Sequence, residues 1–269
     1  MSEQLHNLTL NADQMAAVTE LGNETLQTMD ARYGTGFPHF EGGAEANLGY
    51  HNGYHARTVA EDGVKVGEAL GFSAAELVTT DLAGKGHDIV QLKPRGIMES
   101  ESAAWLINKM AERGLPSVMA EAGALAILGT EPVFEDGKLV GQVATRQDYP
   151  TKSAERVGLA VGSGDFGRML SPIGPLLSHR LYQQIKGCAP GQNPPMGEDF
   201  ERFLAAQTTL REHYRFPLAA AEQILGKHRS RVITYGEEIL RQVQRGDLES
   251  WEQLQAQDLA FMRSLAHEL

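Results

Sequence analysis

The chain has 269 residues, 42% of them hydrophobic, which suits one large helical domain or two small ones with a sizeable core. Its formal net charge of −11 argues against a long nucleic acid as a partner, because backbone phosphates are bound by clustered Lys and Arg. The single cysteine, Cys188, excludes an internal disulfide and a thiolate metal cage, and it fits a reducing, cytoplasmic setting.

The N-terminal sequence MSEQLHNLTLNADQMAAV has no basic segment followed by an apolar one, so we expect no signal peptide. No apolar run approaches the roughly 20 residues that a membrane span needs. We therefore expect a cytoplasmic protein without a membrane partner.

Residues 11–30 are expected to form a helix, because Asn11 or Asp13 can cap its start and an approximate apolar face follows. Residues 31–48 are rich in glycine and aromatic side chains, a composition that predicts an ordered loop. Residues 1–48 are therefore expected to be an N-terminal helix and loop that pack on the core.

Four further helices are expected in the first half of the chain, at 50–71, 73–90, 99–113 and 116–130. Gly71 ends the first of them, and Ser73 with Glu76 forms a capping box at the start of the second. Gly84 and Gly86 interrupt that second helix at a cost of up to about 1 kcal/mol each relative to alanine. They indicate either a close backbone approach near a site or an ordinary packing contact.

Residues 132–143 predict a small β-hairpin that turns at Asp136 and Gly137, with an irregular loop as the alternative. Helices are expected again from about residue 153. The segment SPIGP breaks them, and they resume over 176–186.

The last third of the chain begins with a Pro/Gly-rich connection at 187–199 and continues as charged amphipathic helix. We therefore predict an all-α fold with residues 49–186 as its core and 187–269 as a C-terminal helical extension of the same domain. The extension could close a pocket or form the face of a homodimer, and amphipathicity alone does not choose between them.

Histidines and aspartates occur in a suggestive order along the core. The stretch GYHNGYHARTV, residues 49–59, places His51 and His55 four residues apart, so in a helix they would share one face. His87 and Asp88 are adjacent in GKGHD. Imidazole nitrogen and carboxylate oxygen are the usual ligands of borderline and hard divalent cations. Each piece alone is uninformative, since paired surface histidines and capping aspartates are common.

Taken in order, the blocks YHNGYHARTV, GKGHD, MESESAAWL, AILGT and VGSGDFGRML resemble the HD-domain metal-dependent phosphohydrolase superfamily over residues 49–170. The resemblance implies an HD-domain-like helical bundle. It also implies four ligands to one divalent ion: His55, His87, Asp88 and Asp165. Asp148, in TRQDYP, is the alternative to the last of these.

The resemblance further implies hydrolysis of a small phosphate ester, a nucleotide or a phosphomonoester, by attack of metal-bound water, from which Asp88 can accept a proton. The identity of the ion is open among Mn, Mg, Ni, Co, Fe and Zn, and a second Mg or Mn could bind weakly. No histidine occurs between residues 88 and 178, so a histidine-rich di-iron oxygenase site is not expected.

The first block also resembles the histidine-asparagine element of class I cyclic nucleotide phosphodiesterases, which implies that His51 is a general acid for the leaving oxygen. A cyclic nucleotide phosphodiesterase is therefore one alternative function. Another is a catalytically silent HD-type module that binds a ligand in signalling.

Four residues near the pattern are candidates for binding the small anionic phosphate substrate. Lys93 and Arg95 lie in the turn after the His-Asp pair, and solubilising charge is the alternative for both. Glu99 could hydrogen-bond a ligand or a water, or it could stabilise the first turn of its helix. Asn52 could position His51 or substrate, or it could cap the helix that follows.

Overall fold

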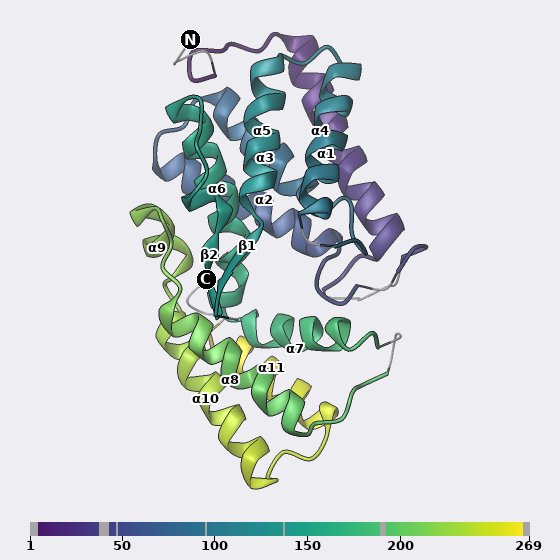
Figure 1. The fold of residues 1–269 in the computed structure, drawn as a ribbon, viewed down its shortest axis with the longest axis vertical. Helices are drawn as coiled ribbons and strands as arrows, with labels where there is room; N and C mark the ends of the chain where they lie inside the picture. The colour runs from purple at the N-terminus through teal and green to yellow at the C-terminus, as the bar shows by residue number, and fades with distance from the viewer. Residues whose placement is uncertain are drawn as a thin grey trace.

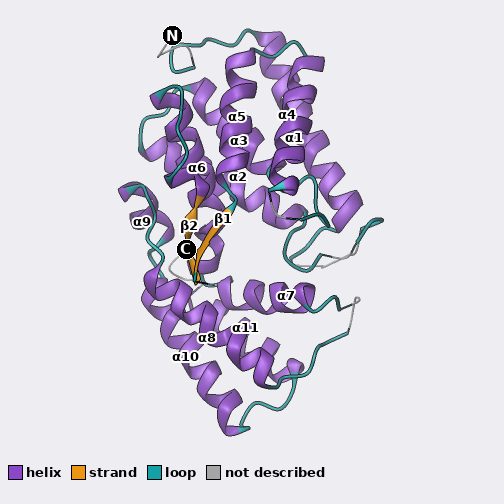
Figure 2. Ribbon diagram, in the orientation of Figure 1, coloured by secondary structure: helices purple, strands orange, loops and turns teal. Residues whose placement is uncertain are grey.

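The computed structural model describes residues 5–37, 43–46, 48–94, 96–136, 138–188 and 192–265. Within these ranges the chain forms eleven α-helices and a single two-stranded antiparallel sheet (Figure 2). The prediction of an all-α fold with a small hairpin is therefore confirmed.

Six helices make the upper part of the molecule in Figure 1. They are α1 (Ala12–Tyr33), α2 (Gly53–Ala69), α3 (Ala74–Gly86), α4 (Ile97–Glu112), α5 (Ser117–Gly129) and α6 (Lys152–Gly167). Apolar side chains from all six helices meet in one large core, which includes Leu21, Val59, Leu82, Leu106 and Val161. Burial of this surface is the main stabilising contribution to the bundle.

The remaining helices lie below this bundle. They are α7 (Gly174–Ile185), α8 (Glu198–His213), α9 (Ala219–Leu225), α10 (Arg229–Arg245) and α11 (Trp251–Leu265). A second core lies among these C-terminal helices and includes Tyr182, Phe200, Ile239 and Leu254. A smaller cluster around Tyr50, Ile173 and Leu177 joins α7 to the segment before α2.

The hairpin consists of β1 (Pro132–Glu135) and β2 (Lys138–Gln142), which pair antiparallel with an irregular register between Val133 and Phe134. Asp136 adopts a left-handed conformation at φ 49°, as expected of a tight hairpin turn. Gly137, the other expected turn residue, lies outside the described residues. The short 3₁₀ helices η1 (Val143–Thr145) and η2 (Arg168–Leu170) follow β2 and α6.

Two helix boundaries differ from expectation, and both bear on the site. The second helix begins at Gly53 rather than residue 50, because Asn52 has an extended backbone and its side chain accepts hydrogen bonds from the N–H groups of Tyr54 and His55. His51 and His55 therefore do not share a helix face. The third helix ends at Gly86 rather than residue 90, which leaves His87 and Asp88 in the turn that follows.

Glycines bring α2 against both of its partners. A Cβ atom on Gly84 would lie 2.6 Å from Cα of Ala60, so α3 approaches the backbone of α2 closely. A Cβ atom on Gly164 of α6 would overlap the carbonyl oxygen of Val59 on the opposite side. The close backbone approach anticipated at Gly84 is therefore present, and it places the three ligand-bearing segments side by side.

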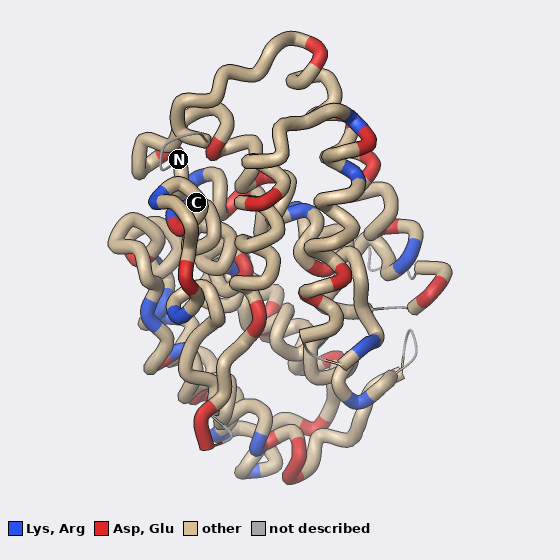
Figure 3. Tube along the Cα trace, turned by 45° about the horizontal axis from the view of Figure 1, so that its top comes forward, with Lys and Arg blue, Asp and Glu red and all other residues tan. Residues whose placement is uncertain are grey.

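Acidic and basic positions are interspersed over both parts of the molecule (Figure 3). None of the described helices has both the length and the apolar character that crossing a lipid bilayer requires.

Candidate metal centre

Three separate segments bring four side chains together. The ligand atoms of His55, His87 and Asp165 all lie within 4.8 Å of one another, and Asp88 lies beside the two histidines but outside this group. His55 lies in the first turn of α2, His87 and Asp88 lie in the turn after α3, and Asp165 lies near the end of α6. The two histidines are almost completely buried, and the two aspartates retain only 16% and 18% side-chain exposure.

The inward atoms of these side chains are close neighbours. Nε2 of His55 lies 3.2 Å from Nε2 of His87. Oδ1 of Asp165 lies 3.1 and 3.7 Å from these two nitrogens, and Oδ2 of Asp88 lies 3.5 and 3.1 Å from them. A cation bound at about 2.1 Å separates adjacent ligand atoms by about 3.0–3.4 Å, so the spacing fits a shared ion. Asp165, and not the exposed Asp148, is the distant aspartate that the fold brings here.

The outward atoms of three of the ligands are held by other groups, whereas Nδ1 of His55 is buried and has no hydrogen-bond partner among the described residues. Nδ1 of His87 donates to the carbonyl oxygen of Gly84 at 2.8 Å, which leaves the lone pair on Nε2. Oδ1 of Asp88 accepts from Nε2 of Gln91 at 2.8 Å. Its other oxygen is buried and lies 3.1 Å from Nε2 of His87, which is a donor only when His87 is protonated. A buried carboxylate oxygen of this kind fits a cation as its partner.

Asp165 is held in the same way from the hairpin. Its Oδ2 accepts from Nε2 of Gln142 at 2.8 Å, and that amide also lies 3.3 Å from the carbonyl oxygen of Thr130. Gln142 is buried at the last position of β2. The hairpin therefore orients a side chain of the centre, because its final residue reaches α6.

The charges of the centre are strongly coupled. Burial alone lowers the pKa of His87, but the carboxylates of Asp88 and Asp165 raise it overall to about 9. Burial raises the pKa of Asp88, yet His87 and His51 lower it by more, so it stays below its ordinary value. Without a bound cation, a proton on His87 partly neutralises the two aspartates.

The segment before α2 holds His51 and His55 in different ways. The backbone N–H of His55 donates to Oδ1 of Asn52, and the ring centroid of Tyr50 lies 4.5 Å from that of His55. His51 lies before the helix, with its ring 5.7 Å from that of His55. Nδ1 of His51 is 2.7 Å from Nε2 of Gln184 in α7. Burial lowers the pKa of His51, and Asp88 partly opposes this.

The expected substrate-binding residues have contacts of their own. The amide of Asn52 caps α2 and donates to the carbonyl oxygen of Leu48 at 2.8 Å. Glu99 accepts from the N–H of Gly96 at 2.7 Å and so stabilises the start of α4. Substrate roles for both stay predictions.

Lys93 forms an ion pair of 2.6 Å with Glu101. It lines an open groove of about 510 Å³ together with Arg32, Trp105 and Gln91, and Gln91 also holds Asp88. Gln91 is thus shared by the groove and the surroundings of the centre, whereas the four candidate ligands do not line the groove. Arg95 lies outside the described residues.

Three glutamines that orient the centre were not found from the sequence: Gln91, Gln142 and Gln184. Gln91 lies three residues after Asp88, with two apolar residues between them. This short spacing would have indicated that the two side chains lie close together. Gln142 and Gln184 lie 23 and 133 residues from the side chains they hold, and nothing local marks them.

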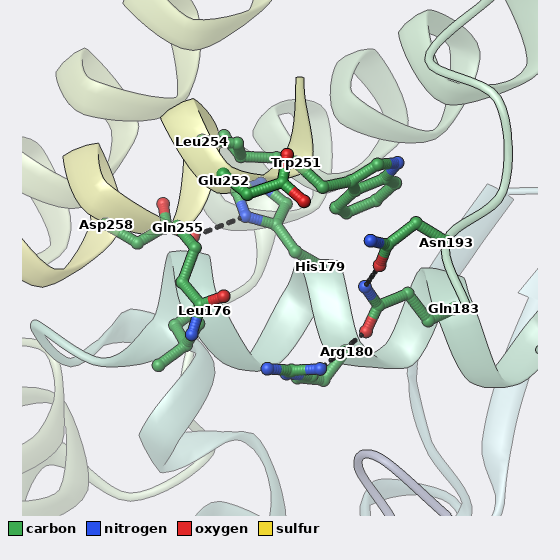
Figure 4. Close-up of a pocket in the computed structure, with 10 residues that line it drawn as sticks. All are labelled: Leu176, His179, Arg180, Gln183, Asn193, Trp251, Glu252, Leu254, Gln255 and Asp258. Atoms are coloured by element: carbon green, nitrogen blue, oxygen red, sulfur yellow. Dashed lines mark hydrogen bonds and ion pairs between the residues drawn. The ribbon is translucent and has the colours of Figure 1, made fainter. Parts of the chain in front are cut away.

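A second cavity, of about 160 Å³, lies between α7 and α11 (Figure 4). In it, Nδ1 of His179 lies 2.7 Å from Oδ2 of Asp258, and the hydroxyl of Tyr235 donates to the other oxygen of Asp258 at 2.9 Å. Both members of the His179–Asp258 pair are buried. The pair anchors α11 to α7.

No protein-family profile matches the chain, and no curated protein matches it by sequence. Crystal structures of Bacillus subtilis YpgQ are similar in fold. YpgQ in complex with ADP gives a TM-score of 0.54 at 12% identity, over 85% of this chain and 96% of that one. YpgQ alone gives 0.53 at 14% identity over the same shares. At such identities the likeness shows a shared fold.

Proposed function

We propose that the chain is an HD-type, divalent-metal-dependent phosphohydrolase that cleaves a small phosphate ester. The observation that carries the proposal is the convergence of His55, His87, Asp88 and Asp165, with one carboxylate oxygen of each aspartate within 3.7 Å of Nε2 of both histidines.

The ligand set matches the charge of the ion. Two carboxylates and two neutral imidazoles carry a net charge of −2, which one divalent cation neutralises. Nitrogen and oxygen donors suit Mn, Fe, Co, Ni or Zn, and a second Mg or Mn would rely on water ligands. A divalent ion held here supplies charge neutralisation for the phosphoryl oxygens and lowers the pKa of a water molecule that attacks phosphorus.

The chain's own groups complete the reaction site. Asp88 and Asp165 are held by amide donors rather than by cations, so their negative charge remains available to the ion. His51 lies beside the ligands without sharing their hydrogen bonds, and it is the candidate donor to the leaving oxygen.

The proposed substrate is a small nucleotide. The groove that Gln91 lines offers the indole of Trp105 and two cations, Arg32 and Lys93, which are paired with the glutamates Glu45 and Glu101. An aromatic face suits a base, and basic side chains suit phosphate. YpgQ, which shares the fold, was crystallised with ADP. Nucleoside phosphates, cyclic nucleotides among them, are therefore the first substrates to test.

The test begins with metal content. Protein purified without chelator should contain about one transition metal ion per chain by elemental mass spectrometry, and His87→Ala and Asp88→Ala should lose it. The matched controls are His213→Ala and Asp148→Ala, which remove the same residue types from exposed positions and should keep the ion. A phosphate-ester screen with added Mn²⁺, Mg²⁺, Ni²⁺ and Co²⁺ then identifies the substrate.

Two outcomes would contradict the proposal in different ways. A wild-type chain that binds no ion even after reconstitution has no such centre. A chain that binds the ion through His87 and Asp88 but hydrolyses nothing in a broad phosphate panel is a silent ligand-binding module.

A further inference from the structure

The two histidines of the first block differ in what surrounds their ring nitrogens. Nε2 of His55 faces the other three ligands. His51 instead has its Nδ1 against the side-chain amide of Gln184, at 2.7 Å. Gln184 belongs to α7, beyond the residues 49–170 that carry the family resemblance.

Two backbone groups determine which way round the Gln184 amide lies. Its Oε1 accepts from the N–H of Tyr50 at 3.1 Å and from the N–H of His51 at 3.2 Å. The reversed amide would set its NH₂ group against two N–H donors and would lose both hydrogen bonds. Nε2 of Gln184 must therefore be the atom that faces His51.

This orientation decides where the proton of His51 lies. An amide NH₂ group only donates, so Nδ1 of His51 must accept from it. In a neutral imidazole one ring nitrogen accepts and the other carries the proton, which places the proton on Nε2. A nitrogen that carries a proton has no lone pair for a metal ion. His51 is thereby excluded as a fifth ligand through that atom.

We propose that Gln184 is a positioning residue that holds His51 in the tautomer protonated at Nε2, so that His51 offers the substrate an N–H donor. The N–H would donate a hydrogen bond to the ester oxygen on which negative charge develops, where a preorganised donor is most effective. The catalytic part rests on the proposed function, whereas the tautomer rests on the hydrogen bonds alone.

The fold supports Gln184 in this task. α7 is anchored from the opposite side by the buried His179–Asp258 pair, and Gly49 packs against the carbonyl oxygen of Arg180 in the same helix. Gln184 can hold the His51 ring in one orientation only if its own position is fixed, and these contacts fix α7.

Gln184→Glu is the decisive variant. A glutamate of the same length can still accept from both backbone N–H groups through one oxygen, but its other oxygen can only accept. Nδ1 of His51 must then carry the proton. If Gln184 has a merely structural role, Gln184→Glu should preserve it. Gln183→Glu is the matched control, since it adds the same charge one residue away on the same helix.

The tautomer is measured by two-bond ¹H–¹⁵N NMR of the full chain at pH 8, both metal-free and with added Zn²⁺. His51→Gln identifies the signals of His51. We expect a proton on Nε2 in the wild type and in Gln183→Glu, and on Nδ1 in Gln184→Glu. With metal content unchanged, and at a pH at which the NMR signals show His51 neutral and protonated on Nδ1, kcat of Gln184→Glu should fall about 100-fold, the effect of losing one preorganised donor.

The results separate this proposal from the proposed function. A wild-type proton on Nδ1, or a folded Gln184→Glu protein whose His51 carries no proton on Nδ1, would overturn the assignment. A switched tautomer with unchanged kcat would overturn the catalytic part. A switched tautomer in a chain that hydrolyses no phosphate ester would leave the tautomer established and the phosphohydrolase rejected.

Discussion

Neutral amides orient the charged ligands of the candidate centre. Gln91 and Gln142 each donate to the outer oxygen of an aspartate at 2.8 Å. An amide donor fixes the carboxylate without neutralising it, whereas a lysine or arginine at the same place would compete with the ion for its charge. The centre therefore keeps a net charge suited to a divalent cation.

Replacing Gln142 should weaken metal binding. Gln142→Leu removes the donor to Asp165 with little change in volume, so the carboxylate loses its fixed orientation. We expect the metal affinity to fall about 10- to 100-fold, the usual effect of losing such a partner. The measurement is titration against a chromophoric chelator.

Gln147→Leu is the control for this change. Gln147 lies five residues further on and donates to the carbonyl oxygen of Leu125 at 2.9 Å, away from the ligands. Equal loss of affinity in both variants would assign the effect of Gln142 to general destabilisation.

Metal affinity should also depend on pH in a defined direction. The metal-free protein holds a proton on His87 below its pKa of about 9, and a cation must displace that proton from Nε2. Affinity for Zn²⁺ should therefore weaken about tenfold for each unit that the pH falls from 8.5 to 6.5. Competition titrations across this range measure it, and a constant affinity would contradict the assignment of His87 as a ligand.

At the scale of elements, the centre depends on how closely the helices approach. His55, the His87–Asp88 pair and Asp165 come from α2, the turn after α3, and α6. The absence of a side chain at Gly84 and Gly164 lets the backbones of these helices touch. The ligands can then meet although they are far apart in the sequence.

Gly84→Ala should therefore damage both stability and metal binding. The added methyl group would lie 2.6 Å from Cα of Ala60, so α3 must move away from α2. We expect a loss of about 1–3 kcal/mol in the free energy of unfolding, together with weaker metal affinity. Chemical denaturation and chelator titration measure the two effects.

Gly86→Ala is the matched control in the same helix. A Cβ atom there would meet its nearest neighbour at 3.9 Å, which is ordinary contact. This variant should be neutral or more stable by up to about 1 kcal/mol, because alanine restricts the unfolded chain. A loss as large as that of Gly84→Ala would show that the close approach of α2 at Gly84 is not the cause of the loss.

At the scale of the whole molecule, the C-terminal helices support the site without supplying a metal ligand. Their own core lies between α8, α10 and α11, and α7 connects it to the bundle. The buried His179–Asp258 pair holds α11 on α7, and Gln184 on the same helix reaches the segment before α2. The position of His51 thus depends on the last third of the chain.

Asp258→Asn should destabilise the protein while the metal ligands stay in place. The change leaves His179 without its buried carboxylate, and losing a hydrogen bond to a charged group costs about 1.5–3 kcal/mol. Metal content should persist, because all four ligands belong to the bundle, but hydrolysis should fall as α7 loses its anchor. Thermal unfolding and elemental analysis measure this.

Tyr235→Phe is the control, since it removes only the hydrogen bond to the other oxygen of Asp258. It should cost about 1 kcal/mol. Loss of the metal from Asp258→Asn would contradict the independence of the ligand set from the C-terminal helices.

The sequence alone determined the helical class, most helix positions, the hairpin and the set of ligand candidates. The helical class, the helix positions and the hairpin follow from local causes: apolar periodicity, caps such as Ser73–Glu76 and glycine stops. The ligand candidates follow from the resemblance to the HD-domain superfamily. Local patterns gave a wrong helix start where a capping residue sets the boundary of the helix. Asn52 starts α2 after His51, so the expected shared face of His51 and His55 does not exist.

Only the tertiary structure decided which distant groups meet. It brought Asp165 rather than Asp148 to the histidines, and it placed Gln142 and Gln184 against side chains 23 and 133 residues away. Such contacts depend on the packing of α2 against α3 and α6, and on the contact of the segment before α2 with α7. A single sequence carries no local mark of that packing, because the energies that select it are summed over the entire core.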